Sequence, residues 1–457
     1  MRSLKNKRRK TMAEYTVKVG MVSLGCPKNQ CDAELMLAKI EKAGFKLVSE
    51  PGLADVVVIN TCGFIQSAKE EAIEEIMEAI NRKNDGINKK IIVTGCLAQR
   101  YKAQMDEEFP EVDAVVGIGR NSDIVEVINS VLMDKRVIID ADVNEKHEMD
   151  GDRMQSTLPH YAYLRVADGC DNCCSYCAIP LIRGHFRSRK MENIIAEAEG
   201  LAKNGVKELV VVAQDTTRYG EDLYGKLMLP ELLTQLCRIE GLKWIRIMYC
   251  YPERITDQLM EVMKKEDKIV KYLDVPIQHC NEEILSAMNR QGNAEQLAAL
   301  FEKLRREIPG IILRTTLITG FPGETEAQFE ELAEFVNDVK FDHLGCFAYS
   351  AEEDTPAAEF PYQVDEKERE HRAEVISEQQ EIRVGERLQQ LIGSTVECVV
   401  EGYDRYSEMY FGRNATQAPE IDGMTYFKSK KRLYIGNFVN VKLTDVIDNN
   451  LLGEVAE

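Results

Sequence analysis

Short β-branched apolar runs that alternate with longer charged segments most restrict how this chain can fold. Val56 to Ile59 and Ile91 to Val93 are such runs, and a charged segment with helical periodicity lies between them, ending near Asn81. Apolar runs this short are typical of parallel strands that are buried on both faces. With further strands at residues 17–24 and 115–116, the pattern predicts right-handed βαβ units and a parallel-sheet α/β domain.

Three of these predicted strands end in a loop that carries one cysteine. These cysteines are Cys26, Cys62 and Cys96. In an open parallel sheet, ligands bind at the carboxyl ends of the strands, so the three thiols are expected to converge. A single cysteine there would be interpreted as a buried structural residue. Three at equivalent positions favour a metal site, because iron–sulfur clusters are held by cysteine thiolates.

A second series of alternating strands and helices begins at Tyr161, after a polar segment from Asp140 to Thr157 that is typical of a linker. The predicted strands are Tyr161–Val166, Leu209–Val212, Trp244–Tyr249, Tyr272–Val275, Ile311–Ile318 and His343–Ala348. Helical patterns lie between them, for example over Met191–Lys203 and Ala327–Val339. These βα units predict a full or partial barrel whose chemistry lies at the C-terminal ends of its strands.

The chain after the barrel changes character. Glu366 to Gln390 is predicted to be a long charged helix. Short alternating strands then follow, at Thr395–Glu401, Met409–Phe411, Thr425–Phe427 and Phe438–Leu443. They predict a small antiparallel β-barrel. The expected organisation is a disordered basic arm (1–14), an α/β domain (15–145), a barrel domain (156–390) and a β-barrel (391–457).

Composition and charge narrow the class of protein. The chain has 457 residues, of which 13 are cysteines, and a formal net charge of −19. An odd number of cysteines in tight groups fits metal chemistry in a reducing cytoplasm better than a secreted disulfide scaffold. Met1 to Lys10 is basic but has no apolar run behind it, so neither a signal peptide nor a membrane span is expected.

The densest group of cysteines is CDNCCSYC, Cys170 to Cys177. A four-cysteine zinc site is one interpretation, although zinc ribbons usually separate their two cysteine pairs by many residues. The other interpretation uses Cys170, Cys174 and Cys177 and leaves Cys173 as a bystander. Three thiolates leave one iron of a four-iron cubane open, and S-adenosylmethionine can chelate that iron through its amino and carboxylate groups. One electron then cleaves the sulfonium and releases a 5′-deoxyadenosyl radical.

These motifs resemble the radical-SAM superfamily, and more closely its methylthiotransferases. The resemblance covers nearly the whole chain after the basic arm and includes a C-terminal barrel like a TRAM domain. The segments SLGCPKN (23–29), NTCGFI (60–65), TGC (94–96) and AIPLIRG (178–184) look like the branch that modifies a ribosomal protein. The branch that modifies tRNA more typically has GCQMN where this chain has GCPKN (25–29).

The resemblance implies specific cofactors and partners. A first [4Fe-4S] cluster on Cys26, Cys62 and Cys96 would hold or donate sulfur. A second, on Cys170, Cys174 and Cys177, would bind S-adenosylmethionine. The substrate would be an aspartate β-carbon on small-subunit ribosomal protein number twelve, free or within the ribosomal subunit. The electron donor would resemble flavodoxin or ferredoxin.

Two alternatives stay open at this point. One is the same chemistry on an isopentenylated adenosine in tRNA, and the other is a metal-binding protein without enzymatic activity. The tail from residue 391 has seven basic and ten acidic residues, which favours a basic protein over nucleic acid as the partner. The basic group at residues 428–432 keeps RNA contact open, although a solvated turn is the favoured interpretation.

Further candidates follow from position. Tyr176 would lie near the adenine by resemblance, or would simply be a packed aromatic residue. Gln214 and Asp215 end a predicted barrel strand and would contact the methionine end of the cofactor. His279 also lies at a strand end, but a lone histidine is more often structural.

Several residues have no firm assignment. Arg183, Arg187 and Arg189 would either neutralise an acidic substrate or face solvent. The glycines of GFPGET (320–325) permit close backbone approach to a ligand, although this loop is not a phosphate-binding fingerprint. Cys31 and Cys173 depart from the family pattern.

Overall fold

A computed structural model describes residues 16–139, 142–144 and 148–456, so the predicted basic arm (1–14) lies entirely outside the described residues. The chain forms two compact units, which are described separately below. The first runs to Met154, and the second runs from Gln155 to the C-terminus and includes residues 64–66.

The first unit is built on a parallel six-stranded sheet with the strand order β2-β1-β3-β4-β5-β6. Its strands are β1 (Lys18–Ser23), β2 (Lys46–Val48), β3 (Val56–Thr61), β4 (Lys90–Gly95), β5 (Ala114–Val116) and β6 (Val137–Ile139). Its helices are α1 (Pro27–Lys42), α2 (Gln66–Asn84), α3 (Cys96–Arg100), α4 (Lys102–Glu108) and α5 (Ile124–Leu132). The predicted parallel α/β domain is confirmed.

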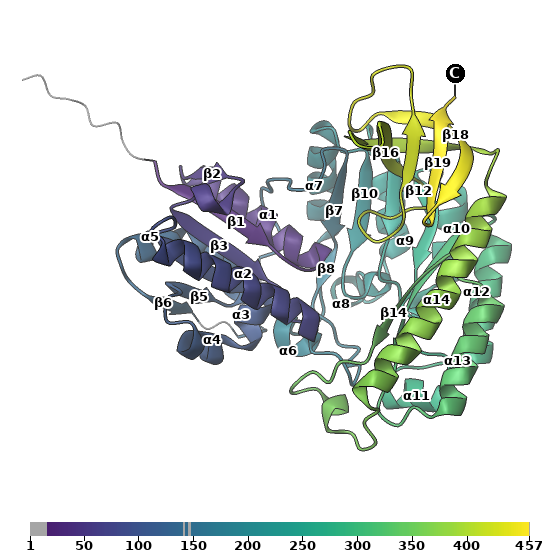
Figure 1. The fold of residues 1–457 in the computed structure, drawn as a ribbon, viewed down its shortest axis with the longest axis horizontal. Helices are drawn as coiled ribbons and strands as arrows, with labels where there is room; N and C mark the ends of the chain where they lie inside the picture. Colours follow the sequence, from purple (N-terminus) through teal and green to yellow (C-terminus); the bar gives the residue numbers. More distant parts are fainter. Residues whose placement is uncertain (1–15, 140–141, 145–147, 457) are drawn as a thin grey trace, which may run out of the picture. The chain divides into compact units, whose positions relative to one another are not determined.

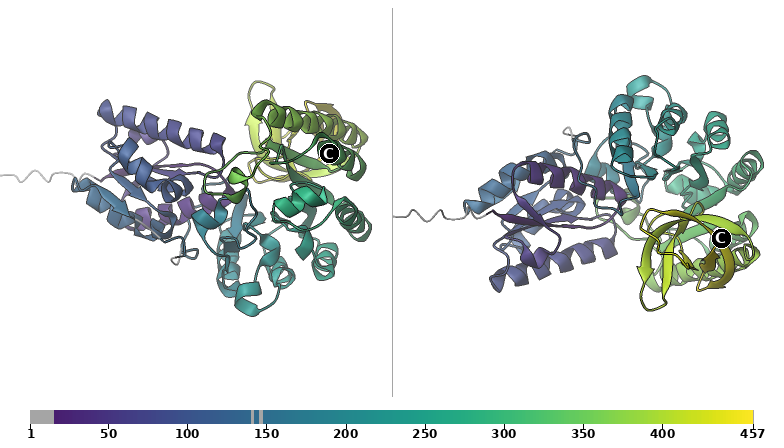
Figure 2. Two further views of the ribbon diagram at one scale, coloured as in Figure 1. Left: turned by 90° about the horizontal axis from the view of Figure 1, so that it is seen from below. Right: turned by 90° about the horizontal axis from the view of Figure 1, so that it is seen from above.

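Helices cover both faces of this sheet, as Figure 2 shows. On one face, α1 and α5 pack Met36, Ile40 and Val127 against Val56 and Val58. On the other face, α2, α3 and α4 pack against the alternate side chains of the same strands. Burial on both faces explains why β3 and β4 are continuous apolar runs and not alternating ones.

The second unit contains a partial barrel of six parallel strands in the order β14-β13-β12-β11-β10-β7. The strands are β7 (Tyr161–Arg165), β10 (Glu208–Val212), β11 (Trp244–Ile247), β12 (Ile269–Asp274), β13 (Ile312–Thr319) and β14 (His343–Ala348), and a two-stranded pair is formed by β8 (Ala167–Asp168) and β9 (Arg187–Ser188). All six barrel strands lie where the sequence predicts them.

Helices surround the barrel, and α14 lies along β14 (Figure 1). They are α6 (Ile179–Arg183), α7 (Met191–Lys203), α8 (Glu221–Tyr224), α9 (Leu229–Cys237), α10 (Asp257–Lys265), α11 (Glu282–Ala287), α12 (Ala294–Glu307), α13 (Glu326–Val339) and α14 (Glu366–Gln390). Short 3-10 turns lie at Pro51–Leu53, Ile118–Asp123, Thr216–Arg218, Pro252–Arg254 and Pro356–Glu359.

The C-terminal part of the second unit is a closed barrel in the order β15-β16-β17-β19-β18. Its strands are β15 (Thr395–Asp404), β16 (Met409–Asn414), β17 (Thr425–Lys428), β18 (Phe438–Ile447) and β19 (Asn450–Val455). The sequence prediction omitted β19. This strand pairs in parallel with β17, so one pair in an otherwise antiparallel barrel departs from the expected pattern.

The β-barrel covers the end of the partial barrel at which the strands begin. Arg413 of β16 donates to the Glu208 carboxylate at 2.8 Å, and Arg246 of β11 donates to its other oxygen at 2.8 Å. Tyr161 and Tyr163 donate to Glu420 at 3.0 and 3.2 Å. These contacts close one mouth of the barrel, so chemistry is left to the opposite end, where the strands finish.

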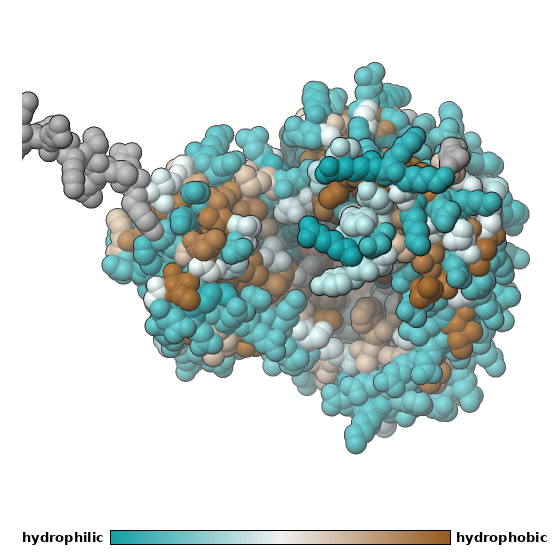
Figure 3. Space-filling view, turned by 45° about the horizontal axis from the view of Figure 1, so that its top comes forward, coloured by the Kyte–Doolittle hydropathy of each residue, from teal (hydrophilic) through white to brown (hydrophobic). Residues whose placement is uncertain are grey.

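Hydrophilic side chains cover most of the face drawn in Figure 3, and hydrophobic residues appear on it in separate patches. Within the described chain, no helix combines the length and the apolar character needed to cross a membrane.

Candidate functional site

The loop with the densest cysteines follows β7 and β8 at the C-terminal end of the first barrel strand. Gly169 turns the chain into this loop with φ +77°, and a methyl group at this position would lie 2.1 Å from the His185 carbonyl oxygen. The Cys170 N–H then donates to the Gly184 carbonyl oxygen at 3.1 Å. Only glycine satisfies both the left-handed turn and the close approach.

The loop presents its thiols unequally. Cys170 and Cys174 are buried and Cys177 is half-buried, whereas Cys173 is exposed and adopts φ +49°. Burial, with a smaller contribution from Cys174, raises the pKa of Cys170 to about 12, and the same two causes raise the pKa of Cys177. A metal ion would have to displace the protons of these thiols, because thiolates are the ligands.

The segment that follows α11 fixes the backbone of this loop. Ser175 donates from its N–H to the Met288 carbonyl at 3.0 Å and from its hydroxyl to the Ala287 carbonyl at 2.7 Å. The Asn289 amide donates to the carbonyls of Asn172 and Cys173 at 3.2 and 2.9 Å. These hydrogen bonds hold the backbone of the loop in place.

Two polar side chains approach the sulfur of Cys174. The Tyr251 hydroxyl lies 3.6 Å from Cys174 Sγ, and Arg290 Nη1 lies 4.0 Å from it. Arg290 also stacks over the Tyr251 ring at 4.4 Å. The sequence analysis singled out neither residue, because nothing in the sequence shows that the ends of β11 and α11 meet this loop.

Tyr176 packs against a small apolar cluster. The buried members of that cluster are Ile284, Met288, Phe321, Tyr349 and Ala357. The interpretation of Tyr176 as a packed aromatic residue therefore describes its present surroundings. Its contact with an adenine stays a prediction.

Gln214 and Asp215 follow β10 but have different environments. The Gln214 amide donates to Asp168 at 2.9 Å, while its buried carbonyl oxygen has no hydrogen-bond partner in the described chain. Asp215 is fully buried and accepts from Asn172, Thr217 and Arg254. Gln214 thus keeps an acceptor for a ligand, whereas the Asp215 carboxylate already has several donors.

The three arginines after the cysteine loop have structural partners, and the expectation that Arg183 and Arg189 face solvent was wrong, whereas neutralisation of an acidic substrate stays a prediction. Arg183 is buried and donates to both carboxylate oxygens of Asp168, at 3.0 and 3.2 Å. Arg189 is buried and pairs with Glu197 at 2.5 Å. Arg187 is half-buried and donates to the carbonyls of His185 and Arg183, at 3.0 Å each.

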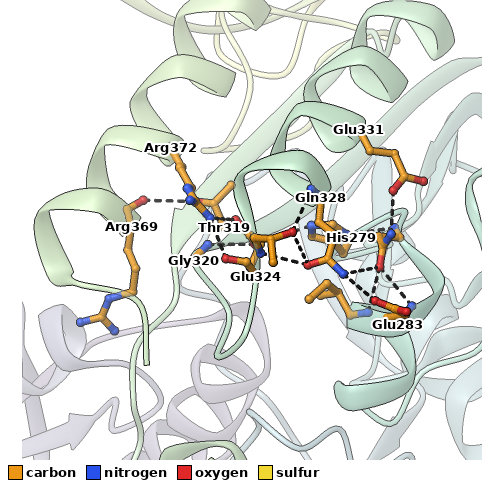
Figure 4. A network of polar contacts seen from close by, with 12 residues as sticks. His279, Glu283, Thr319, Gly320, Glu324, Gln328, Glu331, Arg369 and Arg372 are labelled. Atoms are coloured by element: carbon orange, nitrogen blue, oxygen red, sulfur yellow. Dashed lines mark hydrogen bonds and ion pairs between the residues drawn. The ribbon is translucent and has the colours of Figure 1, made fainter. Parts of the chain in front are cut away.

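Figure 4 shows the polar network around the loop at residues 320–325. Glu324 accepts from the Gly320 N–H at 3.0 Å and from Arg372 of α14 at 2.8 Å, and lies 3.6 Å from His279 Nε2. The fully buried His279 accepts from the Asn281 N–H through Nδ1. His279 is therefore structural, as expected, and the loop is joined to α11 and α14.

In the first unit, the loops that carry Cys26, Cys62 and Cys96 lie against one another. A methyl group at Gly25 would lie 2.7 Å from Cys62 Cβ and 2.9 Å from its Sγ. One at Gly63 would lie 3.1 Å from the Cys96 carbonyl carbon. The parallel sheet thus brings together three loops that are far apart in sequence.

Polar side chains between these loops fix their backbones. Asn29 donates to the Leu24 carbonyl at 2.7 Å, and Asn60 donates to the Asn29 carbonyl at 2.8 Å. Thr61 donates to the Thr94 carbonyl at 2.6 Å. Cys26 is the N-cap residue of α1, which begins at Pro27. A helix N-terminus favours a thiolate over a thiol.

The cysteine loop from Cys170 to Cys177 fits a cluster better than a single ion. No group of three His, Cys, Asp or Glu side chains among the described residues is arranged to hold one metal ion. A four-iron cubane is much wider than one ion, so its thiolates do not have to converge on a point. Separate thiols on a fixed loop, beside a buried guanidinium, suit a negatively charged cluster.

Comparison with family models divides the chain into three matched regions. Residues 18–117 match the uncharacterized protein family UPF0004, residues 164–336 match the radical SAM superfamily, and residues 392–456 match the TRAM domain.

Among solved structures, the radical S-adenosylmethionine methyltransferase TsrM from Kitasatospora setae has a similar fold. Its TM-score is 0.55 at 14% identity, over 75% of this chain and 77% of that one.

Several relatives that share one name align with nearly the full length of this chain. Ribosomal protein uS12 methylthiotransferase RimO of Desulforamulus reducens is 48% identical, over 96% of this chain and 99% of its own. The proteins of that name from Lachnoclostridium phytofermentans and Pelotomaculum thermopropionicum are 47% and 48% identical, with the same coverage. The protein is a radical-SAM methylthiotransferase, and the chain belongs to the RimO family.

Proposed function

We propose that this enzyme attaches a methylthio group to the β-carbon of an aspartate in ribosomal protein uS12. The observation that carries the proposal is the near-complete alignment, at 45–48% identity, with enzymes named for uS12 methylthiolation. The net charge of −19 supports a basic ribosomal protein as the partner, because opposite charges steer association.

Two [4Fe-4S] clusters and S-adenosylmethionine are the cofactors in this proposal. Cys170, Cys174 and Cys177 would hold the cluster that binds S-adenosylmethionine, and Cys26, Cys62 and Cys96 would hold the other. When bound, these groups would relay the electron from a protein donor and supply the radical and the sulfur, which amino-acid side chains cannot provide for an unactivated C–H bond.

The protein's own residues position the reactants and exclude water. Ser175 and Asn289 fix the backbone of the cysteine loop. The unpaired Gln214 carbonyl oxygen is an acceptor for the amino group of the cofactor methionine, and Tyr176 would contact the adenine. Exclusion of water protects a radical from side reactions.

Four further assignments complete the proposal. A low-potential protein such as flavodoxin or ferredoxin supplies the electron. The enzyme acts in the cytoplasm, on free uS12 or on the ribosomal subunit. The domains run from 15 to 145, from 156 to 390 and from 391 to 457. Cys31 and Cys173 do not ligate either cluster.

The test is the intact mass of uS12 from cells that produce wild-type enzyme, Cys170→Ala or Cys173→Ala. Wild type and Cys173→Ala are expected to add one methylthio group, and Cys170→Ala none. Full modification by Cys170→Ala overturns the ligand assignment. Unmodified uS12 together with a methylthiolated adenosine in tRNA overturns the substrate.

A further inference from the structure

Arg290 differs from Arg183, Arg372 and Arg413, three other buried arginines of the second unit, in its partners. Its side chain is 8% exposed, yet it forms no ion pair with a carboxylate of the described chain, and Glu253 acts on it only at longer range. By contrast, Arg183, Arg372 and Arg413 each pair with a buried carboxylate. A buried charge is costly unless an opposite charge or good hydrogen bonds compensate for it.

The geometry around Arg290 shows which group would compensate for its charge. Nη2 donates to the Pro276 carbonyl at 2.8 Å, which leaves Nη1 directed at Cys174 Sγ, 4.0 Å away. The guanidinium is held in this orientation by the Tyr251 ring, whose centroid is 4.4 Å away. The Cys174 sulfur, once it is a thiolate, is therefore the negative charge that this arginine faces.

Tyr251 approaches the same sulfur from its hydroxyl, at 3.6 Å. A metal-bound thiolate has no proton to give, so the phenol is the donor once the cluster is present. Positive charge and hydrogen bonds to the sulfurs are recognised determinants of iron–sulfur reduction potentials.

We propose that Arg290 and Tyr251 are positioning residues that raise the reduction potential of the cluster held by Cys170, Cys174 and Cys177. Reduction adds one electron from a low-potential protein donor, transfers no proton, and makes the cluster and its ligands more negative by one charge. A fixed guanidinium and a phenolic O–H at one thiolate stabilise the more negative state. The inference rests on the ligand set proposed above.

The experiment is a redox titration of the full-length, cluster-loaded enzyme, followed by electron paramagnetic resonance. A background of Cys26→Ala, Cys62→Ala and Cys96→Ala leaves one cluster to observe. Arg290→Gln removes the charge, Arg290→Lys keeps it without the stacked planar fork, and Tyr251→Phe removes the hydroxyl. The matched control is Arg305→Gln, because Arg305 donates only to the carbonyls of Val339 and Lys340.

Arg290→Gln is expected to shift the midpoint potential to a more negative value at unchanged iron content. Arg290→Lys and Tyr251→Phe are expected to shift it less in the same direction, and Arg305→Gln not at all. An unchanged potential in Arg290→Gln overturns the inference. If that variant assembles no cluster, an unchanged potential in Tyr251→Phe overturns it instead.

The proposed ligand set is tested separately in the same preparations. Iron and the reduced-cluster spectrum are expected in the triple-alanine background and are expected to be lost when Cys170→Ala is added. If the triple-alanine variant keeps its reduced-cluster spectrum after Cys170→Ala is added, the proposed ligand set is contradicted. If Cys170→Ala removes the spectrum but Arg290→Gln and Tyr251→Phe leave the midpoint potential unchanged, only the roles of Arg290 and Tyr251 are contradicted.

Discussion

Glu208 is the buried residue on which the contact between the partial barrel and the C-terminal barrel most depends. Its carboxylate is fully buried between Arg246 and Arg413, each 2.8 Å away. Glu208→Gln leaves two buried guanidiniums without that charge, and removal of one partner from a buried ion pair costs about 3–5 kcal/mol. We expect a loss of this size in urea denaturation, and no loss in the exposed control Glu330→Gln.

The same carboxylate predicts how stability depends on pH. Burial alone would raise the pKa of Glu208, but the Arg413 and Arg246 guanidiniums outweigh it and lower the pKa from 4.5 to about 2. Its stabilising contribution is therefore complete above pH 4.5 and is lost as the pH falls toward 2. In this window the denaturation midpoint should fall more steeply in wild type than in Glu208→Gln, and parallel pH profiles would contradict the assignment.

At the residue scale, sequence reasoning could propose site residues where a motif fixes the spacing, and it missed contacts that long-range pairing decides. Cys170, Cys174 and Cys177 were chosen from local spacing alone. Arg183 was expected to meet solvent or substrate, because nothing local shows that Asp168 lies beneath it. Arg290 was missed because its contact with Cys174 joins positions 116 residues apart.

At the scale of single elements, the cysteine loop depends on the turn at Gly169. Alanine there would meet the His185 carbonyl oxygen at 2.1 Å and would have to adopt φ +77°. Gly169→Ala should therefore displace Cys170 and reduce the iron bound by the second unit. Gly200→Ala is the matched control, because a methyl group there meets nothing within 4 Å. Equal iron content in the two variants would contradict this role of the turn.

The long, strongly patterned elements were predictable, and the short ones were not. In the partial barrel, β7, β10, β11 and β12 are nearly continuous buried runs, whereas buried residues alternate along β13 and β14 is only partly buried. The short edge strands β2 and β6, of three residues each, carry little pattern. β19 was missed although its antiparallel pairing with β18 is local, because Asp448 and Asn449, both at positive φ, form the two-residue turn between these strands. The helix α1 begins at Pro27 because proline suits the first helical turn.

At the scale of the whole molecule, the charge counted from the sequence differs from the charge exposed on the surface, because some acidic side chains are buried. The ten acidic residues counted in the C-terminal tail favoured a basic partner. Glu401 is buried against Arg413, and Asp422 accepts from Tyr272 at 2.7 Å with a side chain only 2% exposed. These carboxylates stabilise the second unit and are not presented to a partner. The basic residues at 428 and 430–432 are exposed.

Because these charged side chains are buried between the two barrels, we expect the stability of the partial barrel to depend on the C-terminal barrel. Truncation after Leu391 removes the partners of Glu208, Tyr161 and Tyr272 and exposes a charged mouth that Arg413 and Asp422 now cover. The truncated enzyme should melt at a lower temperature and bind less iron than the full chain.

Alanine at Lys428, Lys430, Lys431 and Arg432 is the matched control for that truncation, because these side chains lie on the outside of the same barrel. This variant should melt like wild type. Equal melting temperatures for the truncated and full-length enzymes would instead mean that the C-terminal barrel is an independent attachment. The buried ion pairs between the two barrels would then not stabilise the second unit. That outcome would contradict the loss of stability expected when Glu208 and Arg246 lose the charged partner that Arg413 provides.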